Sequence, residues 1–485
     1  MCWELKRLDK VSSRLFRFGG VRLLCRAGVM LALIAAVVPG CQRRIDRGPP
    51  NVVIILIDTL RPDHLGCYGY PRETSPNLDR LAGGGTIFWN AVAQSSWTLP
   101  SAASLLTGLY PTRHQAINKS AVLPLHRETL AEVLHSEGYR TAAVVSHTLV
   151  SSDYNLDQGF ELFDETHISG HLEISSPGVT DVATRWLREN GETPFFLFLH
   201  YFDPHYAYLE HEGFVFPTSC RGRVKADVPF HTIQMQRREL GQEGVECLMA
   251  LYDSEIAFTD YHIGVVLEEL RRLGLEESTM VVVTGDHGEE FMEHGWLGHT
   301  VHLYEETVRV PMILCGPGMR RAPQRVNQLV ELVDVMPTLL DLLGIDRDPA
   351  TMDGRSFRDA LDGKEQRGGR AFSEVGFDDV FSRLDRNREP SRNPNLRAVR
   401  SGSWKLILDP VDRRWEFYDL AADPGERVNL AAMSSDERFT TMKQWMVVWM
   451  NRQDELALRE NTAPDTLRVL DEETRERLKA LGYIN

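Results

Sequence analysis

Carboxylate and imidazole side chains follow three apolar stretches of the sequence, and this arrangement suggests a metal site. The apolar stretches are residues 52–57, 195–199 and 280–284. The polar residues that come after them are Asp58, then His200, Asp203 and His205, and then Asp286 and His287. A single acid after a strand is often only a helix cap or a turn residue. Three such ends together are better explained by a divalent cation held by oxygen and nitrogen ligands.

A mostly parallel β-sheet is the element that would bring these strand ends together. The three stretches are apolar on both faces, as buried parallel strands are, and residues 141–146 and 311–315 show the same pattern. Helical patterns at residues 128–137 and 247–273 alternate with them. The alternation predicts a doubly wound α/β fold with helices on both faces of the sheet. In such folds ligands bind beyond the carboxyl ends of the strands.

The last part of the chain predicts a small α+β subdomain. Residues 396–408 and 415–420 predict a short antiparallel sheet, residues 436–459 predict a helix, and the stripe at 442–450 (MKQWMVVWM) is typical of a packing face. Residues 383–394 are polar and contain proline, as domain-edge loops do. We therefore expect a catalytic domain at 51–345, a connecting segment at 346–395 and a C-terminal subdomain at 396–485.

Residues 1–40 differ from the rest of the chain and predict an export segment. Basic residues precede a 12-residue apolar run at 27–38, which is too short for a membrane-spanning helix. Pro39-Gly40-Cys41 then resembles a bacterial lipoprotein signal, with Cys41 as the lipid-bearing residue and 41–50 as a linker. The alternative is an uncleaved anchor helix that starts near Val21. Both predict an exported, membrane-anchored protein, periplasmic or on the cell surface.

The charge of the remaining chain argues against a nucleic-acid partner. Seven basic and two acidic residues give the first forty residues +5, and subtracting this from the −15 of the whole chain leaves −20. Nucleic-acid binding instead depends on clustered Lys and Arg. The cysteines Cys67, Cys220, Cys247 and Cys315 match no zinc pattern, and a Cys220–Cys247 disulfide is one possible pairing.

Several ordered blocks strongly resemble the sulfatase family of the alkaline phosphatase superfamily, over roughly residues 50–485. The blocks in the α/β region are residues 51–81, 99–114, 196–205 (FLFLHYFDPH), 284–299 (TGDHGEEFMEHGWLGH), 303–316 and 330–343. In the C-terminal part, WKLILD, FYDL and DPGERVNL resemble the family's C-terminal subdomain.

The resemblance implies one divalent metal ion held by Asp58, Asp286 and His287, with the nucleophile also bound. Calcium is the ion that the resemblance itself implies. Thr59 stands where many sulfatases have a second aspartate. A site with one fewer carboxylate and a histidine favours zinc, manganese or magnesium instead. This ligand set is similar to that of the superfamily's phosphodiesterases and phosphoglycerol transferases.

The nucleophile position departs from the family pattern. Sulfatases carry Cys or Ser before x-Pro-Ser-Arg, and that side chain is oxidised to formylglycine. Here the segment reads Thr98-Leu99-Pro100-Ser101-Ala102, so a threonine precedes the motif and Ala102 replaces the arginine. The lysine of the family's Gly-Lys-Trp-His block is also missing from residues 145–148 (VSHT). A metal-bound Thr98 hydroxyl is still a sound nucleophile. The alternative is that Thr98 only caps the helix that follows.

Two histidines are candidates for binding the substrate. The resemblance places His205 at an ester-binding position, from which it can protonate the leaving oxygen. His299 is placed to contact the same group. His200, Asp203 and His302 are candidates for orienting the ligands. We interpret His64 as structural.

Together these observations predict an exported, metal-dependent hydrolase of anionic esters, either phosphate diesters or sulfate esters. The substrate is expected to be a small ester or one linked to a glycan or lipid, with a membrane reached through the N-terminal anchor. The alternatives are a formylglycine-independent sulfatase, a phosphoglycerol-type transferase and a catalytically silent sulfatase fold that binds ligands.

Overall fold

The computed structural model describes residues 48–168, 173–216, 233–234, 237–317, 319, 323–364, 369–376, 395–433 and 435–460. The predicted lipid attachment site Cys41, the polar loop 383–394 and Cys220 lie outside these residues. Cys247 takes part in a disulfide, whereas Cys67 and Cys315 are free thiols. Within the described parts of the chain, no helix combines the length and the apolar character needed to cross a membrane.

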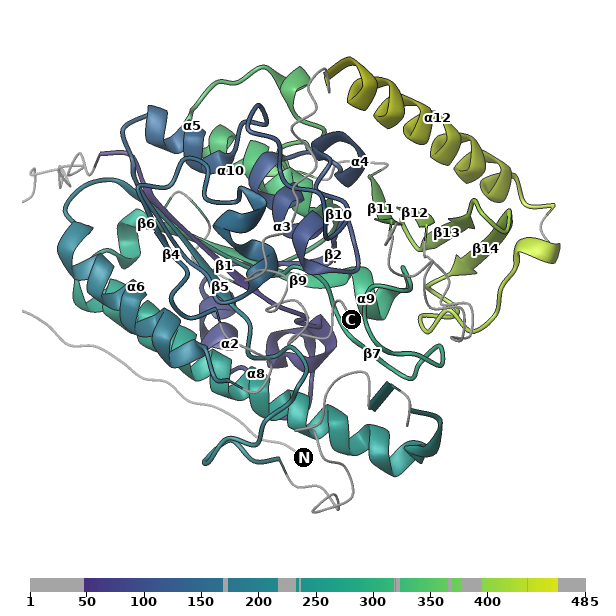
Figure 1. Cartoon of the computed structure of the whole chain (residues 1–485), viewed down its shortest axis with the longest axis horizontal. Coiled ribbons are helices and arrows are strands. Elements are labelled where there is room, and N and C mark those ends of the chain that lie inside the picture. Colours follow the sequence, from purple (N-terminus) through teal and green to yellow (C-terminus); the bar gives the residue numbers. More distant parts are fainter. Residues whose placement is uncertain are drawn as a thin grey trace, which may run out of the picture. The chain divides into compact units, whose positions relative to one another are not determined.

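An eight-stranded, mostly parallel sheet forms the centre of the α/β region (Figure 1). Its strands, in spatial order, are β10 (Gln324–Glu331), β2 (Thr86–Val92), β9 (Arg309–Cys315), β6 (Thr279–Gly285), β1 (Asn51–Ile57), β5 (Phe195–Tyr201), β3 (Arg140–Val144) and β4 (Leu162–Asp164). Only β9 runs antiparallel to both of its neighbours, β2 and β6. All seven residues of β1 are buried, as expected for a central strand that is apolar on both faces.

Helices cover both faces of this sheet, which confirms the predicted doubly wound α/β fold (Figure 1). One face packs against α3 (Thr98–Thr107), α5 (Leu130–Ser136) and α10 (Val335–Leu343). The other face packs against α2 (Pro76–Gly83), α6 (Ser176–Asn190) and the long α8 (Gly241–Arg272). The same region also contains three single-turn helices, which are α4 (Pro111–His114), α9 (Glu305–Val308) and α11 (Arg358–Leu361).

The C-terminal part contains a four-stranded antiparallel sheet rather than a single pair of strands. Its strands, in spatial order, are β11 (Arg370–Gly376), β12 (Asn395–Ser401), β13 (Trp404–Asp409) and β14 (Arg414–Asp419). The predicted strand at 396–408 is two strands, because Gly402 turns the chain with a positive φ of 57°. The proposed division of the chain into domains stays a prediction.

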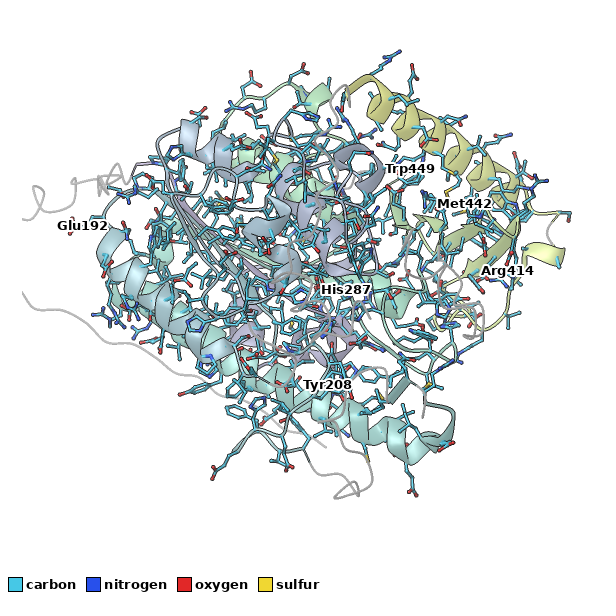
Figure 2. All side chains as sticks on the ribbon, viewed as in Figure 1. Glu192, Tyr208, His287, Arg414, Met442 and Trp449 are labelled. Carbon is cyan, nitrogen blue, oxygen red and sulfur yellow. The ribbon has the colours of Figure 1, made fainter. Side chains whose placement is uncertain are left out.

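Helix α12 (Glu437–Glu460) covers this smaller sheet, and the Met/Trp stripe is its packing face (Figure 1). Met442, Met446 and Trp449 are buried in one apolar cluster with strand residues such as Phe372 and Phe417. Figure 2 labels Met442 and Trp449 on the side of α12 that faces the strands. The stripe therefore builds the core of the C-terminal part, as the sequence predicted.

Buried ion pairs join the C-terminal sheet to α9, the short helix that directly precedes β9 of the large sheet. Lys405 on β13 is 1% exposed, and its Nζ lies 3.0 Å from carboxylate oxygens of both Glu305 and Glu426. Arg400 on β12 lies 2.6 Å from the second oxygen of Glu305. Since Glu305 opens α9, directly before β9, these pairs fix the small sheet against the large one.

Candidate metal centre and ester site

The carboxyl ends of β1, β5 and β6 lie side by side and present the predicted ligands. Strand β1 pairs in parallel with β6 and with β5, so that Ile57 lies opposite both Gly285 and Tyr201. Asp58 follows Ile57, and its backbone N–H donates to the carbonyl oxygen of Tyr201 at 2.9 Å. Asp286 therefore emerges next to Asp58, as two parallel strands of matched length require.

Asp58, Asp286 and His287 form a fully buried cluster whose ligand atoms all lie within 4.8 Å of one another. Nε2 of His287 lies 3.6 Å from Asp58 Oδ1 and 3.4 Å from Asp286 Oδ2. Thr98 at the start of α3 adds its hydroxyl, which donates to Asp58 Oδ2 at 3.4 Å and lies 3.3 Å from His287 Nε2. The structure thus brings together all four residues that were predicted to hold a metal. Figure 2 labels His287 among the segments beyond the sheet.

Backbone groups orient these side chains. Asp286 Oδ1 accepts from the N–H groups of Thr59 at 3.1 Å and His287 at 2.8 Å. Nδ1 of His287 donates to the carbonyl oxygen of Gly288 at 2.9 Å, which turns Nε2 towards the carboxylates. The hydroxyl of Thr59 instead donates to the carbonyl oxygen of Pro204 at 3.0 Å. Thr59 therefore serves the site through its backbone, held in a left-handed conformation with φ of 54°.

The electrostatics of this cluster fit a bound divalent cation. Burial, and then the charge of Asp58, raises the pKa of Asp286 to about 7, and burial lowers the pKa of His287 to about 4. Burial and Glu289 likewise raise the pKa of Asp58. Among the described residues, Asp58 Oδ1 and Asp286 Oδ2 have no hydrogen-bond partner. Two buried, unsatisfied carboxylate oxygens beside an imidazole are costly unless a cation neutralises them.

The capping alternative for Thr98 is wrong. Helix α3 begins at Thr98 itself, with Trp97 in the capping position, and no side-chain cap bond forms. The segment is held instead by Ser101, whose hydroxyl donates to the carbonyl oxygen of Ser95 at 3.0 Å. The Thr98 hydroxyl therefore points towards Asp58 and His287.

The two predicted substrate-binding histidines lie next to this cluster. The ring of His299 lies 4.5 Å from that of His287 and 4.9 Å from that of His205, measured between centroids. Nδ1 of His205 donates to the carbonyl oxygen of Tyr206 at 2.7 Å, so proton exchange with a substrate would use Nε2. Nδ1 of His299 lies 3.0 Å from Oε1 of Glu289.

Glu289 is a functional candidate that the sequence did not reveal. It is fully buried and accepts a hydrogen bond from the Tyr208 hydroxyl at 3.0 Å. Burial raises the pKa of Glu289 to about 8 and lowers that of His299 to about 3. The raised pKa favours the protonated form of Glu289, and in that form Glu289 donates to Nδ1 of His299 and leaves the imidazole proton on Nε2. His299 then presents a hydrogen-bond donor to the site.

Two further histidines lie close to the carboxylate of Asp58. Nε2 of His200, a candidate for orienting the ligands, lies 3.6 Å from Asp58 Oδ2. Nδ1 of His147 lies 3.9 Å from the same oxygen, and its ring stacks on Phe202 at 4.4 Å. His147 was not predicted as a site residue. It follows β3, so the strand-end rule that selected Asp58 would also have found it.

The other candidates for orienting the ligands lie elsewhere. Asp203 accepts from the backbone N–H groups of Ser175 and Ser176 at 2.7 Å each, and so fixes the start of α6. His302 pairs with Glu290 at 2.7 Å. His64 is structural, as predicted, because its Nδ1 lies 2.6 Å from the buried carboxylate of Asp253.

A second group of possible ligands, Glu290, His294 and Glu306, is satisfied without an ion. Nδ1 of His294 lies 2.5 Å from Glu306, and Nε2 contacts the carbonyl oxygen of Glu426 at 3.2 Å. Despite burial, the hydrogen bond to Glu306 raises the pKa of His294. We interpret this group as a charged contact that supports the C-terminal part.

A small cleft lies at the start of α3, where Trp97 and Pro100, the residues that flank Thr98 and Leu99, form part of its lining. Its lining residues come from the segment between β2 and α5 and from two strands of the smaller sheet: Ser95, Trp97, Pro100, Pro111, Thr112, Ile117, Glu374, Gly376 and Arg397. Glu374 on β11 accepts from the Thr112 N–H at 2.6 Å and pairs with Nε of Arg397 at 3.1 Å. Arg397 on β12 also donates from Nη1 to Asn395 at 2.8 Å. The cleft therefore contains the guanidinium group of Arg397, which Asn395 holds in place and whose charge Glu374 neutralises, next to α3.

Comparisons with known proteins agree with this arrangement. A family model described as "Sulfatase" matches residues 50–345, and one described as "N-sulphoglucosamine sulphohydrolase, C-terminal" matches residues 292–452. Arylsulfatase K of Bos taurus is 26% identical, with 84% of each chain covered.

Solved structures show the same fold. One, described as in complex with its substrate D-glucosamine-2-N,6-O-disulfate, has a TM-score of 0.67 at 20% identity, covering 86% of this chain and all of that one. The phosphonate monoester hydrolase of Agrobacterium radiobacter has a TM-score of 0.66 at 21% identity, covering 84% and 96%.

Proposed function

Because the chain belongs to the sulfatase family of the alkaline phosphatase superfamily and is a sulfatase-like ester hydrolase, we propose that it uses a divalent metal ion and Thr98 to cleave anionic esters. The esters are phosphate diesters or sulfate esters, and we favour phosphate diesters. The observation that carries the proposal is the position of the Thr98 hydroxyl, 3.4 Å from Asp58 and 3.3 Å from His287. A helix N-terminus favours negative charge at this place.

Asp58, Thr98, Asp286 and His287 are the residues that would hold the metal. When bound, a divalent cation supplies Lewis acidity, which lowers the pKa of a coordinated hydroxyl and withdraws charge from ester oxygens. The donor set of two carboxylates, one hydroxyl and one imidazole favours zinc, manganese or magnesium over the calcium of the family pattern.

The protein's own groups account for the remaining chemistry. Thr98 loses its hydroxyl proton to water, and Oγ1 forms a bond to the phosphorus or sulfur atom. The bond to the leaving oxygen breaks, and His205, with both ring nitrogens protonated, donates its Nε2 proton to that oxygen. His299 donates a hydrogen bond to an anionic oxygen of the ester. Water then attacks the phosphorus or sulfur atom and gives a proton to Nε2 of His205, and the bond to Oγ1 breaks and Oγ1 takes up a proton, which restores the Thr98 hydroxyl.

The cleft at the start of α3 supports a leaving group that carries hydroxyls, such as a sugar. Arg397 is already neutralised by Glu374, so the pair favours neutral hydrogen-bonding groups over a second anion. The structural neighbour that binds a sulfated glucosamine is consistent with an ester on a glycan. We also propose that the protein is exported and anchored to a membrane through Cys41.

A substrate panel with metal analysis tests the proposal. The purified chain is assayed with bis(p-nitrophenyl) phosphate and p-nitrophenyl sulfate, with calcium, manganese, zinc or magnesium added. We expect about one ion per chain and faster cleavage of the phosphate diester. Faster cleavage of the sulfate would instead indicate a formylglycine-independent sulfatase. Product formation on glycerol rather than water would indicate a transferase. No turnover with any ion would contradict the proposal.

A further inference from the structure

The ester site lacks the cations that the family pattern provides. Ala102 stands at the position of the arginine and is fully buried in α3. Ser146 stands at the position of the lysine, and its hydroxyl donates to the carbonyl oxygen of His200 at 2.8 Å. The buried carboxylates of Asp58 and Asp286 lie at the same place, and a bound divalent cation would be shared between them and the ester. A further cationic side chain would therefore favour the binding of an anionic ester.

Lys119 lies in the loop that joins α4 to α5 and is held close to this site. Its side chain is largely buried, with 9% of the residue exposed. Ile117, two residues earlier, lines the cleft together with Trp97 and Pro100, the residues that flank Thr98 and Leu99. The loop that carries Lys119 therefore lies against the start of α3.

A second anchor fixes the other side of this loop. The hydroxyl of Tyr154 donates to the carbonyl oxygen of Lys119 at 3.0 Å. Tyr154 ends a short 3₁₀ helix, Ser152–Tyr154, that comes soon after His147 and Ser146 at the end of β3. Lys119 is thus held between the Thr98 helix and the segment from which the family lysine is missing.

The turn of α3 against which this loop lies also carries the proposed nucleophile. The hydroxyl of Thr98 lies 3.4 Å from Asp58 Oδ2 and 3.3 Å from His287 Nε2. The buried lysine and the proposed nucleophile therefore belong to segments that pack against each other at the start of α3.

We propose that Lys119 binds an anionic oxygen of the ester beside Thr98 and supplies the positive charge that Ala102 and Ser146 do not. The inference rests on the proposed function, because it assigns a further residue to the same site. A lysine is a compact point charge on a flexible stem, unlike the planar fork of an arginine. One such charge suits esters that carry one negative charge, namely phosphate diesters and sulfate monoesters. We therefore expect dianionic phosphate monoesters to be poorer substrates.

Three variants of the full chain test this inference. Lys119→Met keeps the length of the side chain without its charge, Lys119→Arg keeps the charge, and Lys364→Met removes an exposed lysine as a matched control. Each variant is checked for folding by circular dichroism. The measurements are kcat/KM for bis(p-nitrophenyl) phosphate and the Kd of inorganic sulfate by calorimetry.

We expect Lys119→Met to lower kcat/KM and the affinity for sulfate by about 10- to 100-fold each, as for the loss of a charge-assisted hydrogen bond. Lys119→Arg is expected to keep most of the activity and of the sulfate affinity, and Lys364→Met is expected to keep both unchanged. Unchanged kcat/KM and sulfate affinity in Lys119→Met would overturn the inference. If Lys119→Met does not fold, Lys119→Gln takes its place, and the same outcomes apply.

The two proposals fail in different ways. If the wild-type chain hydrolyses no ester, the proposed function fails. Loss of sulfate binding in Lys119→Met would still support Lys119 as the anion-binding residue. Sulfate binding that is absent from the wild-type chain, or equal in the wild-type chain and Lys119→Met, overturns the assignment of Lys119.

Discussion

Oγ1 of Thr98 lies 3.3 Å from Nε2 of His287, although 189 positions separate the two residues in the sequence. His287 is placed by the end of β6, and Thr98 by the first turn of α3. Both side chains are fully buried. A hydroxyl at this place can be ionised and presented to a substrate without any rearrangement of the backbone.

Replacement of Thr98 tests the nucleophile directly. We expect Thr98→Ala to lower kcat for bis(p-nitrophenyl) phosphate by about 10³-fold or more, because the variant lacks the Oγ1 atom that would form the bond to phosphorus. Thr98→Ser retains a hydroxyl and is expected to keep a substantial part of the activity. Steady-state kinetics check this, and full activity of Thr98→Ala would rule out Thr98 as nucleophile.

Removal of a carboxylate from the cluster should abolish metal binding. Loss of a residue that only hydrogen-bonds to a metal ligand typically lowers metal affinity by roughly 10- to 100-fold. Asp286→Asn removes a ligand itself, so we expect a larger loss of metal affinity. Elemental analysis of the dialysed protein and titration with zinc or manganese measure the effect. The exposed Asp412→Asn serves as control. Equal metal content in the wild-type protein and Asp286→Asn would contradict the assignment.

Metal affinity should rise with pH up to about 7 and then level off. The pKa of Asp286 in the folded chain is raised from an ordinary value of 3.8 to about 7. Below pH 7 its carboxyl group is protonated, and an incoming cation must displace that proton. The apparent affinity is therefore expected to fall by up to roughly tenfold for each pH unit below 7. Calorimetry at pH 5, 6, 7 and 8 measures the slope, and a flat profile would argue against a role for Asp286.

The guanidinium in the cleft should affect sugar esters but not aryl esters. We expect Arg397→Met to raise KM for an ester on a sugar by about tenfold, through loss of hydrogen bonds to hydroxyls. For bis(p-nitrophenyl) phosphate, whose leaving group has no hydroxyls, kcat/KM should change little. Parallel kinetics on both substrates separate the effects. An equal loss on both would indicate damage to the site rather than to leaving-group recognition.

Loss of Lys405 should destabilise the protein strongly. Lys405→Met leaves Glu305 and Glu426 with one cation fewer in a buried setting, which typically costs about 3–5 kcal/mol. Arg459→Met, which breaks an exposed pair with Glu455 on α12, should cost at most about 1 kcal/mol. Urea unfolding measures both. Equal midpoints for the two variants would show that the buried pairs do not hold the sheets together.

The strands that the sequence predicts correctly are those buried on both faces. β1, β5 and β6 are continuous apolar runs with no exposed residue. The edge strand β10 mixes exposed and buried positions, and β2 contains polar residues, so neither shows a clear apolar run. The antiparallel direction of β9 could not be predicted, because an apolar run carries no information about strand direction.

The site was predictable where residues follow a buried strand or belong to a family motif. Asp58, Asp286 and His287 satisfy both conditions, and Thr98 occupies the motif position. Lys119 satisfies neither, because a lysine in a polar loop looks like an ordinary surface residue until its burial is known. Arg397 is similar: only the pairing of β12 with β11 brings it to Glu374 and the cleft.

One wall of the cleft comes from α3, α4 and the loops beside them, and the other comes from β11 and β12 of the smaller sheet. The proposed nucleophile Thr98 begins α3 and the proposed metal ligands follow β1 and β6, whereas β11 and β12 carry Glu374 and Arg397, which we propose to face the departing alcohol. Substitutions at the cleft-lining positions of these two strands, Glu374, Gly376 and Arg397, would leave the reacting atoms in place. They are therefore the positions to randomise when a library is screened for activity on a new alcohol, and the positions at which duplicated copies of this gene should first diverge.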